Sequence, residues 1–200
     1  KLKTWQPNRV IVVEKSPAYW DAARVRLNAI HFYPIESVDA EERTFRTGQL
    51  HVTSTIPISK VSVYRDDPGR RGFLHQETAL GTYFYSFNVS KPPLDDVRVR
   101  RALAYTINRR DIVEHVSLGG QVPAAHFTPP DTGEFTAVAR LPHDPVRARQ
   151  LLAAAGFAGG KNFPRLEILF NTNESHRKIA EAIQQMWRRE LGLDVAIAIR

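Results

Sequence analysis

Histidine and acidic side chains are the groups through which this 200-residue chain could bind a metal or transfer protons. The histidines do not follow the spacing of a zinc site, and the chain has no cysteine. Neither an HExxH pair nor a GxSxG turn occurs. The seven histidines are His31, His51, His75, His115, His126, His143 and His176. The sequence therefore predicts no catalytic residue, no metal site and no cofactor, with an enzyme whose groups converge only on folding as the alternative.

His176 has the clearest candidate role, because it lies in the first turn of a predicted helix that follows a predicted strand. Open α/β sheets bind ligands at the carboxyl ends of their strands, and the free N–H groups of a helix start attract anions. We expect His176 to contact a ligand carboxylate, with Asn171 and Asn173 adding polar contacts. The alternatives are an exposed histidine and ordinary turn chemistry for the two asparagines.

Aromatic side chains alternate along residues 83–87. In a strand, Tyr83, Tyr85 and Phe87 point to one side, and Phe84 and Ser86 point to the other. Tyrosine combines a flat apolar ring with a hydroxyl group, and a strand edge can pair with an extended peptide of any sequence. We expect Tyr83 and Tyr85 to line a ligand cleft; packing in a core is the alternative.

Residues 154–161, AAGFAGGK, match a phosphate-binding loop only in part. Ala155 stands where that loop needs glycine, and Asn162 stands where it needs serine or threonine. A helix precedes the segment and a strand follows it, which is the reverse of the required order. The segment is therefore interpreted as a connection.

Periodicity and end signals predict the alternating strands and helices of an α/β fold. Strands are expected at residues 9–14, 29–34, 51–56, 82–89, 166–171 and 193–199. Helices are expected at residues 39–47, 57–64, 96–108, 110–118, 144–155 and 175–191.

Residues 91–116 contain the strongest predicted helix. Val99, Leu103 and Ile107 share one face at i, i+4, i+8 spacing, which predicts a buried stripe. Asp95 and Asp96 are both expected to accept hydrogen bonds from N–H groups of the first turn.

Charge and hydropathy limit the function classes. The net charge is +7 and 42% of the residues are hydrophobic, which suits a globular domain. The arginines are scattered and often lie beside an acidic residue, as in Arg65 and Asp66, which favours a solvated surface over nucleic-acid binding. No apolar run approaches the roughly 18 residues of a membrane helix, so we do not expect the chain to span a membrane.

Five segments follow one another in an order typical of one family. They are SPAYWDAARVRLNAIHFYPI (16–35), FRTGQL (45–50), GTYFYSFNVSKPPLDDVRVRRAL (81–103), VPAAHFTPP (122–130) and HDPVRARQLLAAAGF (143–157). Together with DDVRVRRALAYTINRRDIV (95–113), they resemble the extracellular solute-binding proteins, family 5, of peptide-importing ABC transporters. Ser16, Gln49 and His51 depart from the family pattern.

The resemblance implies a fold and a division into lobes. It predicts part of a two-lobed, periplasmic-binding-protein-like fold of type II, with mixed sheets flanked by helices. Residues 1–80 would belong to the first lobe and residues 81–200 to the second, after a hinge-crossing strand near 78–88. Family members are considerably longer, so we interpret the chain as an internal fragment and expect that it does not bind ligand alone.

The resemblance also implies a function without a chemical step. It predicts a substrate-binding component, periplasmic or membrane-anchored outside a Gram-positive cell, that captures short peptides and delivers them to ABC permease subunits. In the oligopeptide-binding branch, a histidine at the position of His176 faces the carboxyl end of the ligand. Binding of nickel, a sugar or an opine, and a peptidase-like α/β enzyme, are the alternatives.

An arginine cluster of the strong helix is interpreted as helix surface. The alternative is a face toward the membrane subunits of the transporter. The cluster comprises Arg98, Arg100, Arg101, Arg109 and Arg110.

Overall fold

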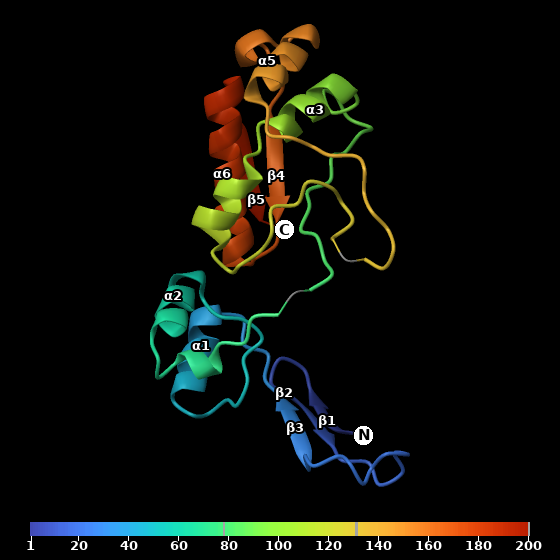
Figure 1. Cartoon of the computed structure of the whole chain (residues 1–200), viewed down its shortest axis with the longest axis vertical. Coiled ribbons are helices and arrows are strands. Elements are labelled where there is room, and N and C mark those ends of the chain that lie inside the picture. Colours follow the sequence, from blue (N-terminus) through green and yellow to red (C-terminus); the bar gives the residue numbers. More distant parts are fainter. Residues whose placement is uncertain (78, 131, 200) are drawn as a thin grey trace. The chain divides into compact units, whose positions relative to one another are not determined.

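The computed structural model describes residues 1–77, 79–130 and 132–199. The chain divides into two compact units, Lys1–Lys60 and Val61–Arg200, whose elements are labelled in Figure 1. Thr78, near the predicted start of the hinge strand, and Arg200 lie outside the described residues. The mixture of strands and helices confirms the predicted α/β class.

The first unit contains an antiparallel sheet of three strands in the order β1-β2-β3. The strands are β1 (Leu2–Gln6), β2 (Val10–Glu14) and β3 (Ala29–Phe32). A tight turn joins β1 to β2, in which Asn8 has a φ of 57° and Arg9 N donates to Gln6 O at 3.1 Å. The sequence did not predict β1, because Lys3, Thr4 and Gln6 are polar, whereas β2 consists of branched apolar residues except for Glu14.

One face of this sheet carries apolar side chains in register. Trp5 lies opposite Ile11, which lies opposite Phe32 in the next strand. All three are exposed in the described structure, and Trp5 keeps 68% of its surface. A concavity of about 300 Å³ extends from this row toward Tyr33.

Helix α1 (Val38–Arg46) begins at Ser37, whose hydroxyl accepts from Ala40 N at 3.3 Å. Glu42 on this helix is only 3% exposed. Its carboxylate pairs with Lys60 and, at 3.5 Å, with Arg46. A buried charge needs such partners, so this ion pair fixes α1 against the last residues of the first unit. Helix α2 (Ile58–Asp66) begins there.

The second unit packs helices against a parallel pair of strands (Figure 1). The strands β4 (Leu166–Phe170) and β5 (Val195–Ile199) pair in parallel, and α6 (Glu174–Leu191) connects them. Helices α3 (Val97–Tyr105) and α5 (Pro145–Ala154) contribute to the same apolar core. Short helical segments complete the unit: η1 (Arg71–Phe73), α4 (Arg109–Asp111), η2 (Ile112–Ser117) and η3 (Ala158–Gly160).

A buried polar contact joins α6 to α3 within this core. The Trp187 indole N–H donates to the carbonyl oxygen of Leu103 at 2.9 Å. The Thr106 hydroxyl donates to the same oxygen at 2.8 Å, and Thr106 is fully buried. The carbonyl at the end of α3 is therefore satisfied without water, and the core can close over it.

The helix end signals are confirmed in α5 and α6. Asp144 accepts from Arg147 N at 2.9 Å and Pro145 starts α5, as the sequence predicts. Gly192 ends α6 with a φ of 71°, a conformation that glycine adopts without strain. The predicted helix at 110–118 is also helical, but it divides into α4 and the π-helical segment η2.

Two predicted strands are wrong. Residues 51–56 form no strand, because Ser54 N and Oγ donate instead to the Glu41 carboxylate, at 2.9 and 3.2 Å. Residues 82–89 form none either, since within the described structure their backbone is hydrogen-bonded only in a local turn, where Lys91 N donates to Asn88 O at 3.3 Å. A strand exists only where a neighbour pairs with it.

The boundary between the compact units falls after Lys60, whereas the predicted lobe boundary lies after residue 80. The two boundaries describe different objects. The compact units are defined within this chain, and the lobes are defined within a longer two-lobed fold. The lobe boundary and the hinge therefore stay predictions.

Candidate ligand-binding site

The end of β4 and the start of α6 present two asparagines next to His176. Asn173 is the N-cap of α6, and its side-chain oxygen accepts from Ser175 N at 2.9 Å and from His176 N at 3.3 Å. The cap fixes the first turn of the helix and with it the backbone of His176. The side-chain oxygen of Asn173 is thus occupied by two backbone N–H groups, as expected if Asn173 stabilises the turn and does not contact a ligand.

Asn171 contacts the imidazole directly. Its Oδ1 lies 2.6 Å from His176 Nδ1. His176 is half-buried and Asn171 is exposed. The hydrogen bond holds one ring nitrogen in place and leaves Nε2 as the nitrogen that can meet a ligand.

Tyr83 covers one face of the imidazole. The two rings are stacked, with centroids 4.6 Å apart and planes inclined by 26°. The Tyr83 hydroxyl donates to the Tyr85 hydroxyl at 3.3 Å. Burial, and next the hydrogen bond from Tyr83, raise the pKa of Tyr85, so its hydroxyl stays neutral.

The structure brings together four of the five predicted site residues. Tyr83, Tyr85, Asn171 and His176 form one continuous set of contacts, and Asn173 supports it from the cap. We call the four residues the Tyr83–His176 cluster. The core-packing alternative also holds for part of the aromatic segment, since Tyr85 and Phe87 pack against the apolar core.

Sequence reasoning missed two features of this region. Phe84 makes an edge-to-face contact with Phe127, with centroids 5.0 Å apart. The direct bond between Asn171 and His176 was also not predicted. Spacing gave no signal for the contact between Phe84 and Phe127, because Phe127 lies in the distant proline-rich loop. The bond between Asn171 and His176 could have been suggested, because the two residues are five apart across a strand-to-helix turn.

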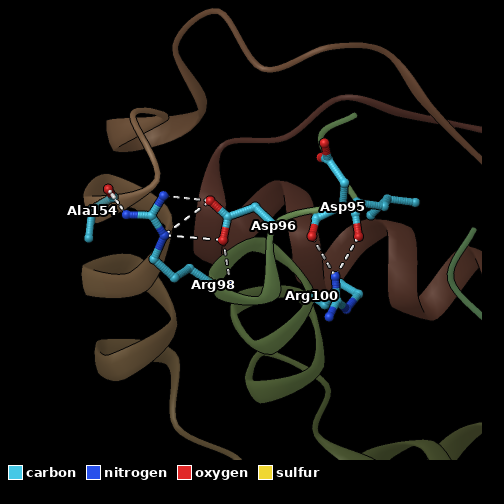
Figure 2. Close-up of polar contacts among 6 residues, drawn as sticks. Asp95, Asp96, Arg98, Arg100 and Ala154 are labelled. Carbon is cyan, nitrogen blue, oxygen red and sulfur yellow. Dashed lines mark hydrogen bonds and ion pairs between the residues drawn. The ribbon is translucent and has the colours of Figure 1, made fainter. Parts of the chain in front are cut away.

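The arginine cluster is largely engaged within the chain (Figure 2). The Arg98 guanidinium pairs with the Asp96 carboxylate at 2.6 Å and donates to Ala154 O at 2.7 Å. It thereby joins the start of α3 to the end of α5. Arg100 donates to the carbonyl oxygens of Leu94 and Asp95, at 2.8 and 2.9 Å.

Other arginines of the cluster also have partners. Arg110 pairs with Glu114 at 2.6 Å. Arg109 donates to Ile107 O at 3.2 Å, and burial lowers its pKa. The helix-surface interpretation is thus supported by contacts, and the transporter-facing alternative stays a prediction.

A second concavity lies beside α3. It has a volume of about 400 Å³ and is lined by Pro92, Pro93, Asp95 and Phe157, among others. It is separate from the residues of the Tyr83–His176 cluster.

Within residues 1–77, 79–130 and 132–199, no group of three or more histidine, cysteine or acidic side chains is placed to hold a metal ion. Within the same residues, no helix combines the length and the apolar character needed to cross a bilayer.

Comparison with known proteins gives matches over the whole chain. Residues 1–200 match the family model of bacterial extracellular solute-binding proteins, family 5 Middle. The periplasmic murein peptide-binding protein MppA of Escherichia coli is 36% identical over 203 residues. That alignment covers 98% of this chain but only 37% of MppA. The chain therefore spans little more than a third of the length of this curated relative.

Solved structures agree with the sequence matches. The E. coli murein tripeptide binding protein MppA superposes with a TM-score of 0.90 over 100% of this chain and 40% of that chain, at 36% identity. Haemophilus influenzae OppA, in complex with the peptide RPPGFSPFR, gives a TM-score of 0.82 at 27% identity, over 100% of this chain and 40% of that chain. These neighbours confirm the predicted fold class, of which the chain forms one part.

Proposed function

The chain belongs to family 5 of the bacterial extracellular solute-binding proteins, and from this membership we propose that it is part of a receptor for short peptides. The receptor closes two lobes around a peptide and delivers it to the membrane permease of an ABC importer. No chemical step is involved. The peptide complex of the H. influenzae relative and the murein peptide named for MppA support this ligand class.

The Tyr83–His176 cluster is the observation that carries the proposal. A neutral hydroxyl, a stacked aromatic ring and an imidazole lie together at the carboxyl end of β4. Imidazolium can donate to a carboxylate, and every unmodified peptide ends in one. Binding through a terminus and through ring faces tolerates many peptide sequences, which suits a nutrient importer.

In this proposal the aromatic segment also serves as a hinge. Residues 1–80 belong to the first lobe and residues 81–200 to the second, and the chain crosses between them near 78–88. A few φ/ψ changes in such a segment can swing one lobe against the other. Tyr83 would then reach the ligand from the crossing segment, and His176 would reach it from the second lobe.

The same membership supports a proposal for the cellular location. We place the receptor in the periplasm, where the E. coli relative MppA is named as residing. The alternative is an extracellular, membrane-anchored receptor in a Gram-positive organism.

Calorimetric titration of the full-length protein with tri- to pentapeptides tests the proposal. We expect saturable binding with a dissociation constant on the order of 1 μM. Replacing His176 by Gln removes a charge-assisted hydrogen bond, which is worth about 1.5–3 kcal/mol, so the affinity should fall roughly 10- to 150-fold. The matched control is His143→Gln, since His143 is an exposed histidine outside the cluster.

Two results would contradict the proposal. Hydrolysis of the peptides without a stable complex would favour the peptidase alternative. Mass spectrometry of ligands that copurify with the full-length protein would favour another family ligand if it found a nickel complex, a sugar or an opine in place of peptides.

A further inference from the structure

We infer that Asn171 sets the tautomer of His176, so that capture of a ligand carboxylate takes up one proton from solvent. This inference rests on the proposed function, because it concerns how the same site recognises the carboxyl end of a peptide. It assigns Asn171 the role of a positioning residue that acts through the imidazole.

The geometry at His176 defines the donor and the acceptor. Asn171 Oδ1 lies 2.6 Å from His176 Nδ1, and an amide oxygen can only accept. His176 Nδ1 must therefore carry the proton and donate it. A neutral imidazole has one N–H donor and one lone-pair acceptor, so Nε2 carries the lone pair.

Stacking by Tyr83 holds the ring in this orientation. With the ring centroids 4.6 Å apart, a flip of the imidazole would have to break both the stack and the bond to Asn171. The tyrosine side chain is itself tied to the Tyr85 hydroxyl at 3.3 Å. The Nε2 lone pair is thus presented in a fixed direction.

A carboxylate cannot bind to that lone pair. Both groups are acceptors, and two acceptors repel unless a proton lies between them. When one proton from solvent adds to Nε2, the imidazolium donates from Nδ1 to Asn171 and from Nε2 to the carboxylate. No covalent bond other than N–H changes, and the positive ring offsets the negative ligand group.

The neighbouring groups leave this proton to His176. Tyr83 stacks on the ring, and the raised pKa of Tyr85 keeps the hydroxyl behind it neutral. The charged residues in the first two turns of the same helix pair with one another. These pairs are Glu174 with Lys178 at 3.1 Å and Arg177 with Glu181 at 2.9 Å.

The measurable consequence is pH-dependent affinity. If one proton is taken up for each ligand, the affinity rises about tenfold for each unit by which the pH falls, as long as the free imidazole is neutral. A peptide amide has no terminal carboxylate, so its binding lacks this proton. The α-amino group is the same in both peptides, and comparing them removes its contribution.

Imidazole ¹⁵N spectra of the full-length protein test the first step, with His176 assigned from the loss of its signals in His176→Gln. In free protein, at a pH where these spectra show a neutral ring, we expect a proton on Nδ1 and none on Nε2. A free protein with the proton on Nε2 would overturn the inference. This measurement needs no ligand, so it stands even if the proposed function fails.

Calorimetry in buffers of different ionisation enthalpy tests the second step, with trialanine and trialanine amide as probes. We expect the binding of trialanine to take up close to one proton more than the binding of its amide. If the amide does not bind, the comparison is with the binding of trialanine to the His176→Gln variant. Binding without that extra proton overturns the inference and leaves the proposed function intact. Failure of trialanine and longer peptides to bind contradicts the proposed function instead.

Asn171→Ala separates positioning from folding. Without the acceptor, the neutral ring can carry its proton on Nε2, so the extra proton uptake should fall well below one and the pH profile should flatten. Asn108→Ala is the matched control, because Asn108 caps α4 through Asp111 N and does not contact His176. An unchanged pH profile in Asn171→Ala would show that Asn171 does not set the tautomer of His176.

Discussion

Adjacent carboxylates at the start of α3 have different roles, although the sequence suggested the same role for both. The Asp96 side chain accepts from Arg98 N at 2.7 Å and pairs with the Arg98 guanidinium. Asp95 contributes only its backbone oxygen, to Arg100. Figure 2 shows the Asp95 carboxylate pointing away from the Arg100 guanidinium. The expectation that both side chains cap the helix was therefore wrong for Asp95.

This difference predicts a difference in acid stability. The Arg98 guanidinium, and next its backbone N–H, lower the pKa of Asp96 from the usual 3.8. A lowered folded-state pKa contributes stability above the unfolded value and loses it as the pH falls through the folded value. We expect Asp96→Asn to lower the melting temperature of the full-length protein at neutral pH, with the gap to wild type closing below about pH 4.

Asp95→Asn is the control for this effect, measured by the same melting curves across the same pH range. It should follow the wild-type profile. If the Asp95 variant reproduced the loss and the Asp96 variant did not, the assignment of the cap would be reversed.

The candidate site could be predicted one residue at a time, but its contacts could not. His176 was identified because strand-end and helix-start signals are local. Tyr83 was identified because alternation along a strand is also local. The stacking of these two rings joins segments that are far apart in the sequence, and a single sequence contains no signal for such a contact.

At the scale of elements, a pair of glycines allows the connection after α5 to pack against the end of α6. A Cβ added at Gly160, whose φ is +76°, would lie 2.6 Å from the carbonyl oxygen of Gly192. Real Cβ atoms do not approach a backbone oxygen so closely. The glycine-rich segment that partly matches a phosphate loop is therefore explained by close backbone packing.

We predict that Gly160→Ala destabilises the second unit more than Gly159→Ala. Both residues have a positive φ, but a Cβ at Gly159 meets nothing within 4 Å. Gly159→Ala should cost about 1–3 kcal/mol of unfolding free energy from backbone strain alone. Gly160→Ala adds the backbone clash, so its denaturant midpoint should be clearly lower. Equal midpoints would argue against the close approach of Gly160 to Gly192.

Helices were predicted better than strands for a physical reason. The caps of α5 and α6 lie within a few residues of the elements they start, so a short window of sequence contains the signal. A strand depends on a partner elsewhere in the chain. Residues 82–89 have a strand-like pattern but form no strand, and β1 has a weak pattern but pairs with β2.

At the scale of the whole molecule, the chain spans 37–40% of the relatives and neighbours compared above. In the proposed receptor, two lobes supply contacts to one peptide, and much of that surface lies in the remainder of such a protein. The Tyr83–His176 cluster alone offers a tyrosine hydroxyl, a ring face and one imidazole nitrogen. We therefore expect the cluster to be necessary for binding but insufficient.

Calorimetric titration of the isolated 200-residue chain checks this expectation. Tri- to pentapeptides should give no saturable binding at concentrations of roughly 1–100 μM, whereas the full-length protein should bind them. Circular dichroism of the same sample should first establish that the isolated chain is folded. Saturable binding by the isolated chain would mean that residues 1–200 suffice.

The burial of Trp187 gives the second unit an optical reporter of its own. The chain has three tryptophans, of which Trp5 and Trp20 are 68% and 85% exposed and lie in the first unit. Trp187 is 6% exposed and donates to Leu103 O at 2.9 Å. A soluble quencher such as acrylamide should therefore suppress the emission of Trp5 and Trp20 first and leave a blue-shifted signal from Trp187. Loss of the Trp187 signal would report opening of the core that supports α6. His176 lies in the first turn of this helix, at the end opposite Trp187.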